Sequence, residues 1–316
     1  MKTKGIIIIN RDFSLEWLDL LLKSGFNTVG LHSLYQYGGV EGHINWLLKE
    51  ETQQLIKTFE ENGITIEHQL HAVDWLLPRS LFATNPNWFR VNDKGERVND
   101  WNLCVSNEDA LEFIENSAYK LAILLKQKSH NYYIWADDCL NSICHCEKCS
   151  KLSGADQSMI ICNRILKGLK RFDKDARLSF LAYQDSLTVP TVAPDEGVFL
   201  EFAPIDRNHF AKLSGEDQAN VKVRKILQNL LKIFPANETQ ILEYFLDVSL
   251  FCKWKKEDAK ALDLNEERLA SDIDWYSSLN VAGITTFAGF IDSDWRAKHG
   301  DNDIILYGKT LNKYLK

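Results

Sequence analysis

The feature that most constrains the fold of this chain is a regular alternation between short apolar runs and longer amphipathic segments. The first pair is GIIIIN (5–10) and SLEWLDLLLKSG (14–25), in which Ser14 is the expected N-cap and Gly25 the expected stop. The short runs are typical of strands and the longer ones of helices. The eight strands expected are 5–10, 27–34, 64–77, 131–138, 177–185, 198–205, 240–248 and 283–292.

Nearly every expected strand is followed by a helical pattern. Eight such units, with roughly 250 residues plus insertions, predict an α/β fold that consists of a single (β/α)8 TIM barrel. No linker rich in Pro, Gly or Ser divides the chain, so we expect one domain over 1–316, with long loops after strand three (78–106) and strand four (138–157). A doubly wound sheet is the alternative, but NRDFSLEW lacks the glycines of a phosphate-binding turn. The helices expected are 14–25, 44–63, 107–127, 158–172, 221–234, 265–280 and 303–315.

The charge balance and the apolar runs bear on possible partners. The net charge is -7, with 37 basic and 44 acidic residues, which argues against a nucleic-acid partner. The four isoleucines near the N-terminus are too few for a signal-peptide core or a membrane span, and no other apolar stretch reaches spanning length. We therefore expect a cytoplasmic protein with no membrane partner, or a secreted one whose leader has been removed.

Polar and aromatic residues gather where the expected strands end, which is where TIM barrels build their active sites. Acids dominate and lysine is missing there, which fits a sugar site better than a phosphate site. A structural role is the alternative, because strand-end carboxylates often cap a helix or pair with arginine. Glu201 and Glu243 stand inside apolar runs, so their charge must be paired or their pKa shifted. The residues expected to bind substrate are His32, His71, Trp135, Tyr183, Gln184, Glu201, Arg207, Asp292 and Trp295.

The segment WADDCLNSICHCEKC (135–149) combines two adjacent acids with a cysteine motif. Its C-x-C-x-x-C spacing can wrap three thiolates around one zinc ion, which needs a fourth ligand for tetrahedral closure. A site of four cysteines would be structural, since it leaves no open position for a zinc-bound water. Disulfides or chance clustering are the alternatives, and no organic cofactor is expected. The motif is formed by Cys144, Cys146 and Cys149, and the candidates for the fourth ligand are Cys104, Cys139 and His145.

Four further segments are NPNWFRVNDKGERVNDWNLCVSNEDALEFI, DDCLNSICHCEKCSKLSGADQSMIICNRI, RLSFLAYQDSLTVP and VFLEFAPIDR. Together they resemble a bacterial glycoside-hydrolase-like family called domain of unknown function 4838. The resemblance is clear over residues 65 to 207, and the cysteine motif is its most specific part. It implies a barrel related to carbohydrate-active enzymes, with a carbohydrate as the partner.

The chain is also similar, more distantly, to the family 42 β-galactosidases. That similarity implies structural zinc, places Asp138 near the acid position at the end of strand four, and makes Glu243 the match for the nucleophile at the end of strand seven. The chain has Ala-Asp-Asp where those enzymes have Glu preceded by Asn. The zinc ligands implied are Cys104, Cys144, Cys146 and Cys149.

The adjacent acids resemble the Asp-Glu pair of the family 20 hexosaminidases as well. There, one acid orients the substrate's acetamido group and the next protonates the leaving oxygen, so that Asp137 and Asp138 would share one site and Glu243 would bind sugar hydroxyls.

Together these patterns predict a glycoside hydrolase that cleaves an unidentified glycosidic bond. Asp138 is the predicted general acid, Glu243 the nucleophile or base, and Asp137 and Glu201 are the reserve catalytic residues. One alternative is a catalytically inactive barrel that binds carbohydrate. The other is a metal-dependent hydrolase or isomerase, which would use His68 or His71 with Asp74 and Glu201.

Overall fold

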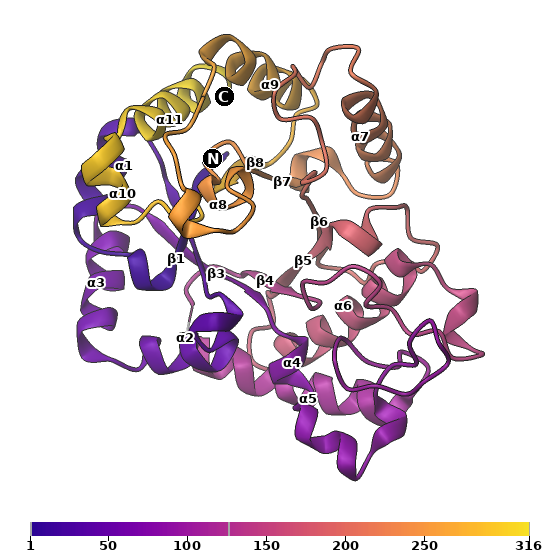
Figure 1. Cartoon of the computed structure of the whole chain (residues 1–316). Coiled ribbons are helices and arrows are strands. Elements are labelled where there is room, and N and C mark those ends of the chain that lie inside the picture. Colours follow the sequence, from indigo (N-terminus) through magenta and orange to yellow (C-terminus); the bar gives the residue numbers. More distant parts are fainter. Residues whose placement is uncertain (1, 126, 316) are drawn as a thin grey trace. The chain divides into compact units, whose positions relative to one another are not determined.

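The strands of the chain form one closed parallel barrel in the order β1 to β8, in a computed structural model that describes residues 2–125 and 127–315 (Figure 1). The predicted (β/α)8 architecture is therefore confirmed. The strands are β1 (Thr3–Ile9), β2 (Thr28–His32), β3 (Thr65–His71), β4 (Asn131–Trp135), β5 (Arg177–Ala182), β6 (Val198–Phe202), β7 (Gln240–Glu243) and β8 (Gly283–Phe287).

Helices follow every strand except β5, which a short connection joins to β6, as the amphipathic segments predict. None of the described helices is both long and apolar enough to cross a membrane. The helices are α1 (Glu16–Ser24), α2 (Gly39–Leu47), α3 (Glu50–Glu61), α4 (Val73–Leu76), α5 (Glu108–Leu125), α6 (Gly154–Lys170), α7 (Gln218–Leu230), α8 (Val248–Phe251), α9 (Glu266–Ser278), α10 (Ser293–His299) and α11 (Asn302–Tyr314).

The chain divides into two compact units. The first unit comprises the segments up to Leu34, Leu47–Glu67, and the part from Glu201 onward. In it, β1 pairs with β2 and β8, β7 pairs with β6 and β8, and α11 packs against α1 and α9 (Figure 1). The expectation of a single domain over 1–316 stays a prediction.

The second unit comprises Tyr35–Trp46 and His68–Leu200. In it, β4 pairs with β3 and β5, and α5 packs against α6. Gly168 permits this close packing, because a Cβ at that position would collide with the carbonyl oxygen of Glu115 on α5. The expected strand 64–77 is too long, because β3 ends at His71 and the short helix α4 follows within that range. The expected loop 78–106 contains two 3-10 turns, Arg79–Ala83 and Pro86–Trp88.

Several element boundaries differ from the sequence-based expectation. Ser14 is not the N-cap of α1: Leu15 holds that position, and the carbonyl of Ser14, not its hydroxyl, accepts from the Trp17 N–H. Gly25 ends the helix as expected, with a left-handed φ of 78°. The helix expected over 44–63 is two helices, because the backbone becomes extended at Lys49.

Candidate functional site

The two adjacent acids after β4 have different surroundings. The strand ends at Trp135, so Asp137 and Asp138 both lie beyond its last residue. They are therefore free of the alternation that would send neighbouring strand side chains to opposite faces. Asp137 is buried and Asp138 is exposed.

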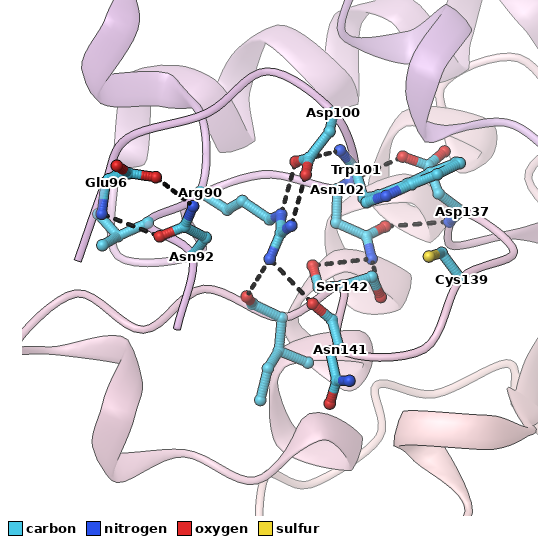
Figure 2. A network of polar contacts seen from close by, with 12 residues as sticks. Arg90, Asn92, Glu96, Asp100, Trp101, Asn102, Asp137, Cys139, Asn141 and Ser142 are labelled. Carbon is cyan, nitrogen blue, oxygen red and sulfur yellow. Dashed lines mark hydrogen bonds and ion pairs between the residues drawn. The ribbon is translucent and has the colours of Figure 1, made fainter. Parts of the chain in front are cut away.

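Asp137 organises the loop that follows β3. Its carboxylate accepts hydrogen bonds from the backbone N–H of Asp74 at 3.0 Å and of Asn102 at 2.6 Å, and it forms an ion pair with Arg79. The Asn102 side chain in turn accepts from the Asp137 N–H at 3.0 Å and donates to the hydroxyl of Ser142 at 2.8 Å (Figure 2). These contacts give Asp137 the role of a buried anchor.

Asp138, by contrast, is presented to solvent among polar side chains. The amide of Gln184 donates to the Asp138 carboxylate at 3.3 Å and to the phenol oxygen of Tyr183 at 2.9 Å. The backbone N–H of Asp138 points at the phenol oxygen of Tyr35, 3.5 Å away. Gln184 has a φ of 47°, a left-handed conformation that non-glycine residues adopt at a cost and that often marks functional sites.

A small cavity of about 40 Å³ lies beneath these groups. Four of the residues expected to bind substrate line it, namely His71, Trp135, Tyr183 and Gln184. The Nδ1 of His71 donates to the carbonyl of Ala136 at 2.5 Å, and its ring meets Trp135 edge-on with centroids 5.0 Å apart. The cavity has room for a few water molecules but not for a sugar ring, so a sugar would have to lie on the exposed side of Asp138.

A further acid, Asp74, lies at the start of α4. Burial raises the pKa of its carboxyl, and the charge of Asp137 raises it further. Burial and the charges of Asp137 and Asp74 likewise raise the pKa of Tyr35, whose ring meets Trp101 edge-on with centroids 6.4 Å apart. Sequence reasoning missed Tyr35 and Trp101, since both belong to loops whose path no periodic pattern predicts.

The four cysteines implied by the family 42 similarity converge. Their sulfur atoms all lie within 4.8 Å of one another, with the Sγ of Cys104 3.7 Å from that of Cys146 and 3.9 Å from that of Cys149. Four thiolates about 2.3 Å from a tetrahedral zinc would stand about 3.8 Å apart. Of the three candidates for the fourth position, Cys104 joins the group, whereas Cys139 and His145 do not.

Neighbouring groups hold the cysteines in place. The amide of Gln157 accepts from the N–H of Cys144 at 2.8 Å and donates to the carbonyls of Cys144 and Cys149 at 3.0 and 3.1 Å. The backbone N–H of Val91 donates to the sulfur of Cys144 at 3.3 Å. Outer contacts of this kind orient metal ligands in proteins, so the donor set fits a four-coordinate metal.

The loops after β3, β4 and β5 are also joined by polar contacts. The guanidinium of Arg90 forms a bidentate pair with Asp100, at 2.7 and 2.6 Å, and donates to the carbonyls of Asn141 at 2.9 Å and Ile143 at 3.3 Å (Figure 2). Asp185, after β5, accepts from the Asn141 N–H at 3.1 Å. The segment that carries Asp138 is therefore braced on both sides.

Glu243, the predicted nucleophile or base, lies in the first unit and is fully buried. Its carboxylate pairs with the guanidinium of Arg207 at 3.0 Å and accepts from the hydroxyl of Tyr276 at 2.6 Å. Arg207 also pairs with Asp272 at 3.0 Å, and burial raises the pKa of Asp272 to about 6. Tyr276 and Asp272 both belong to α9, so the side chain of Glu243 faces that helix. These contacts compensate the buried charge of Glu243, and its catalytic role stays a prediction.

The remaining predicted binding residues of the first unit are mostly buried. His32 meets Phe287 edge-on with centroids 5.3 Å apart, and Glu201 lies buried in β6. Asp292 caps α10 by accepting from the Trp295 N–H at 2.8 Å, and the indole N–H of Trp295 donates to the carbonyl of Lys260 at 3.0 Å. Their predicted contact with substrate stays a prediction.

The metal-dependent alternative finds little support in the geometry. His68 contacts His43 through ring nitrogens 2.9 Å apart in the interior, and burial lowers the pKa of His68 to about 4. In residues 2–125 and 127–315, the groups that could hold a metal are the four cysteines and a partly exposed set of His130, Asp173 and Asp175. His68, His71, Asp74 and Glu201 do not form such a group.

The barrel is similar to those of several solved glycoside hydrolases. PbGH5A of Prevotella bryantii, a GH5 enzyme in complex with a xyloglucan tetradecasaccharide, has 13% identity and a TM-score of 0.55, over 95% of this chain and 86% of that one. The GH42 β-galactosidase Gan42B has 12% identity and a TM-score of 0.58, over 98% and 56%. A pneumococcal GH20 module of StrH has 14% identity and a TM-score of 0.52, over 99% and 84%.

At these identities the similarity shows the fold, which the chain shares with glycoside hydrolases of three families. The chain spans little more than half the length of Gan42B. No curated protein matches it in sequence. Residues 34–256, more than half of the chain, match the family described as Domain of unknown function (DUF4838), and the chain therefore belongs to that family.

Proposed function

We propose that this chain hydrolyses a glycosidic bond and that Asp138 is its general acid. The observation that carries the proposal is the difference in environment between two adjacent acids: Asp137 is buried and bound by the loop after β3, whereas Asp138 is exposed beside Gln184. A general acid must come within hydrogen-bond reach of the leaving oxygen. Of the two, Asp138 is the one that a substrate can reach.

Asp137 is proposed to act as a positioning residue. Its ion pair with Arg79 and its hydrogen bond from Asn102 fix the backbone immediately before Asp138. Catalytic groups need such support, because a displacement of about 1 Å can lower the rate about a hundredfold. The aromatic residues nearby, Tyr35, Trp101 and Tyr183, would offer ring faces to the apolar side of a sugar.

Two carboxyls are candidates for the second catalytic group. Glu243 is the one that the family 42 similarity implies, and it is bound on one side by Arg207 and on the other by Tyr276. Asp74 is the one that the second unit offers, because it is half-buried and has a raised pKa. The burial of Glu243 also favours a second candidate function, a barrel that binds carbohydrate without cleaving it.

We further propose that the four cysteines hold one structural zinc ion. Sulfur separations of 3.7 and 3.9 Å support this assignment, since they match the edge of a ZnS4 tetrahedron. Four thiolates would leave no coordination position for water, so the ion would brace the loops and take no part in proton transfer.

Hydrolysis can be tested with a panel of p-nitrophenyl glycosides and neutral oligosaccharides, using the wild-type chain, Asp138→Asn and the control Asp93→Asn. Asp93 is an exposed acid of the same unit, in a turn before the cysteine motif. We expect turnover by the wild type and the control and almost none by Asp138→Asn. Turnover by all three proteins would exclude Asp138, and binding of a sugar without turnover by any would favour the inactive barrel.

A further inference from the structure

A groove of about 530 Å³ lies in the first unit, and neither Asp137 nor Asp138 is among the residues that line it. Three segments line it: the loop after β6, with Arg207 and Phe210; the loop after β7, from Phe245 to Leu264; and the start of α9, with Arg268. We call it the β6–β7 groove. Its volume falls within the range of roughly 300 to 1,000 Å³ that is typical of sites for small ligands.

One wall of the groove is aromatic and unusually exposed. Phe210 is 67% exposed and Phe251 is 40% exposed, with their ring centroids 5.8 Å apart. His209 meets Phe251 edge-on at 5.8 Å, and Phe245 lies buried beneath the guanidinium of Arg207. Exposed phenylalanine faces are stabilised when a ligand covers them.

The other walls carry charges of both signs in near balance. Lys253, Lys260 and Arg268 line the groove together with Asp258 and Asp263. The charge of Arg207 is already offset by its ion pairs within the first unit. An anionic ligand would be attracted by the three cations but repelled by the two acids, and a lipid chain would leave all five charged groups without a polar partner. A neutral molecule with many hydroxyl groups can both donate to the acids and accept from the cations.

The backbone at the edge of the groove is strained as well. Lys253, which lines the groove, and Trp254 after it have φ angles of 53° and 59°. Two consecutive non-glycine residues in this region are costly, and such strain is concentrated at ligand clamps and active sites. A hydrogen bond of 2.7 Å from the Trp254 N–H to the carbonyl of Ser249 holds the conformation, which leaves the indole 61% exposed.

From these features we infer that the β6–β7 groove binds a segment of a neutral oligosaccharide, with Phe210 and Phe251 covered by the apolar faces of its rings. A sugar ring combines an apolar C–H face with hydroxyl groups at its edge, which matches an aromatic wall opposite walls of mixed charge. The inference deepens the proposed function and rests on it, because it names the class of substrate as an uncharged glycan longer than one ring.

Binding is best measured in an Asp138→Asn background, so that no probe is consumed, by titration calorimetry with cellotetraose, xylotetraose, mannotetraose, tetra-N-acetylchitotetraose and tetragalacturonate. We expect at least one of the four neutral probes to bind. Phe210→Ala and Phe251→Ala should each raise its Kd about tenfold, because each loses an aromatic contact. The matched control is Phe172→Ala, which removes another exposed phenylalanine, 47% exposed, in the second unit. It should leave the Kd unchanged.

Raising NaCl from 0.05 to 0.5 M should leave the Kd of the neutral probe within about twofold, since little of the affinity is coulombic. The inference is overturned if no neutral probe binds, if binding is unaffected by Phe210→Ala and Phe251→Ala in folded protein, or if tetragalacturonate binds best and salt weakens it. If the wild type shows no turnover but binding of the neutral probe is lost in Phe210→Ala, the hydrolase proposal fails and the inference about the groove stands. If the wild type turns over its substrate and Phe210→Ala leaves the KM unchanged, the hydrolase proposal stands and the inference about the groove fails.

Discussion

One peptide bond separates Asp137 from Asp138, yet the fold gives the two carboxylates opposite environments. The first is enclosed by backbone N–H groups and Arg79, and the second faces solvent beside Gln184. The difference arises because β4 ends two residues before Asp137, which frees the chain to turn. Residue identity alone, Asp beside Asp, does not contain this distinction.

Replacing Asp138 by Asn should lower kcat by about 10² to 10⁴, the usual contribution of a general acid. The exposed position predicts little change in thermal stability. Steady-state kinetics on the preferred glycoside, with a melting curve of each protein, would check both statements. Asp93→Asn should match the wild type, and a kcat within a factor of two of the wild type in Asp138→Asn would remove this residue from the mechanism.

Replacing Glu243 by Gln tests a buried ion pair. Removing one partner of such a pair costs about 3 to 5 kcal/mol of the free energy of unfolding, because Arg207 is left incompletely compensated. Urea denaturation would measure this loss. Glu267→Gln, on the exposed face of the same helix that binds Glu243, is the control and should unfold like the wild type. Unchanged stability together with a large loss of kcat in Glu243→Gln would instead establish Glu243 as a catalytic carboxylate.

At the scale of elements, the loops after β3 and β4 depend on one another. Cys104 comes from the first of these loops, and Cys144, Cys146 and Cys149 come from the second. Arg90 adds a second connection through the carbonyls of Asn141 and Ile143.

Zinc content should therefore distinguish the predicted ligands from the neighbouring cysteine. We expect about one zinc ion per wild-type chain after dialysis, and the same in Cys139→Ser, because Cys139 lies outside the cluster. Cys104→Ser should lose the metal and melt at a lower temperature, since metal binding adds to the free energy of folding. Metal analysis by mass spectrometry would check this. Full zinc occupancy in Cys104→Ser would show that another group completes the site.

The elements differ in how far the sequence could predict them. The eight strands were located because buried parallel strands form apolar runs. The expected strands extend too far at their C-terminal ends, because the polar residues after a strand continue the pattern. The expected strand 131–138, for example, ends at Trp135 in the structure. Helix α10 was missed, since SDWRAKH is too short for a clear period.

The sequence predicts those parts of the candidate site in which the residue types themselves indicate a chemical role. The cysteine motif and the acid pair stand out in the sequence, and the four cysteines do converge. Tyr35, Arg79 and Trp101 could not be found, because their positions depend on the course of irregular loops. Glu243 is buried against α9 because of the face of β7 that it occupies. The sequence does not reveal this face, since a buried parallel strand has no alternation of polar and apolar residues.

At the scale of the whole molecule, the buried pair of His43 and His68 links stability to pH. The pKa of His68 is lowered to about 4 in the folded chain, against an ordinary value of about 6.5. Between these values the unfolded state binds more protons, so the contribution of His68 to stability is present above about pH 6.5 and is lost as the pH falls toward 4. The loss amounts to about 3 kcal/mol.

Asp247 opposes this trend, because burial raises the pKa of its carboxyl to about 6. Its contribution to the free energy of unfolding therefore falls as the pH rises toward 6. The prediction is therefore made for a difference between two proteins. The free energy of unfolding of the wild type minus that of His68→Gln should decrease by about 3 kcal/mol from pH 7 to pH 4. A difference for His68→Gln that is constant with pH would refute the assignment.

The braced loops after β3, β4 and β5 also have an evolutionary consequence. Because shared ligands and the contacts of Arg90 and Asp185 join them, an insertion or deletion in one loop would disturb the other two. The loops after β6 and β7 share no ligand of that cluster. Within this family, sequence divergence should therefore accumulate around Phe210 and Phe251, while the three braced loops are inherited together as one block.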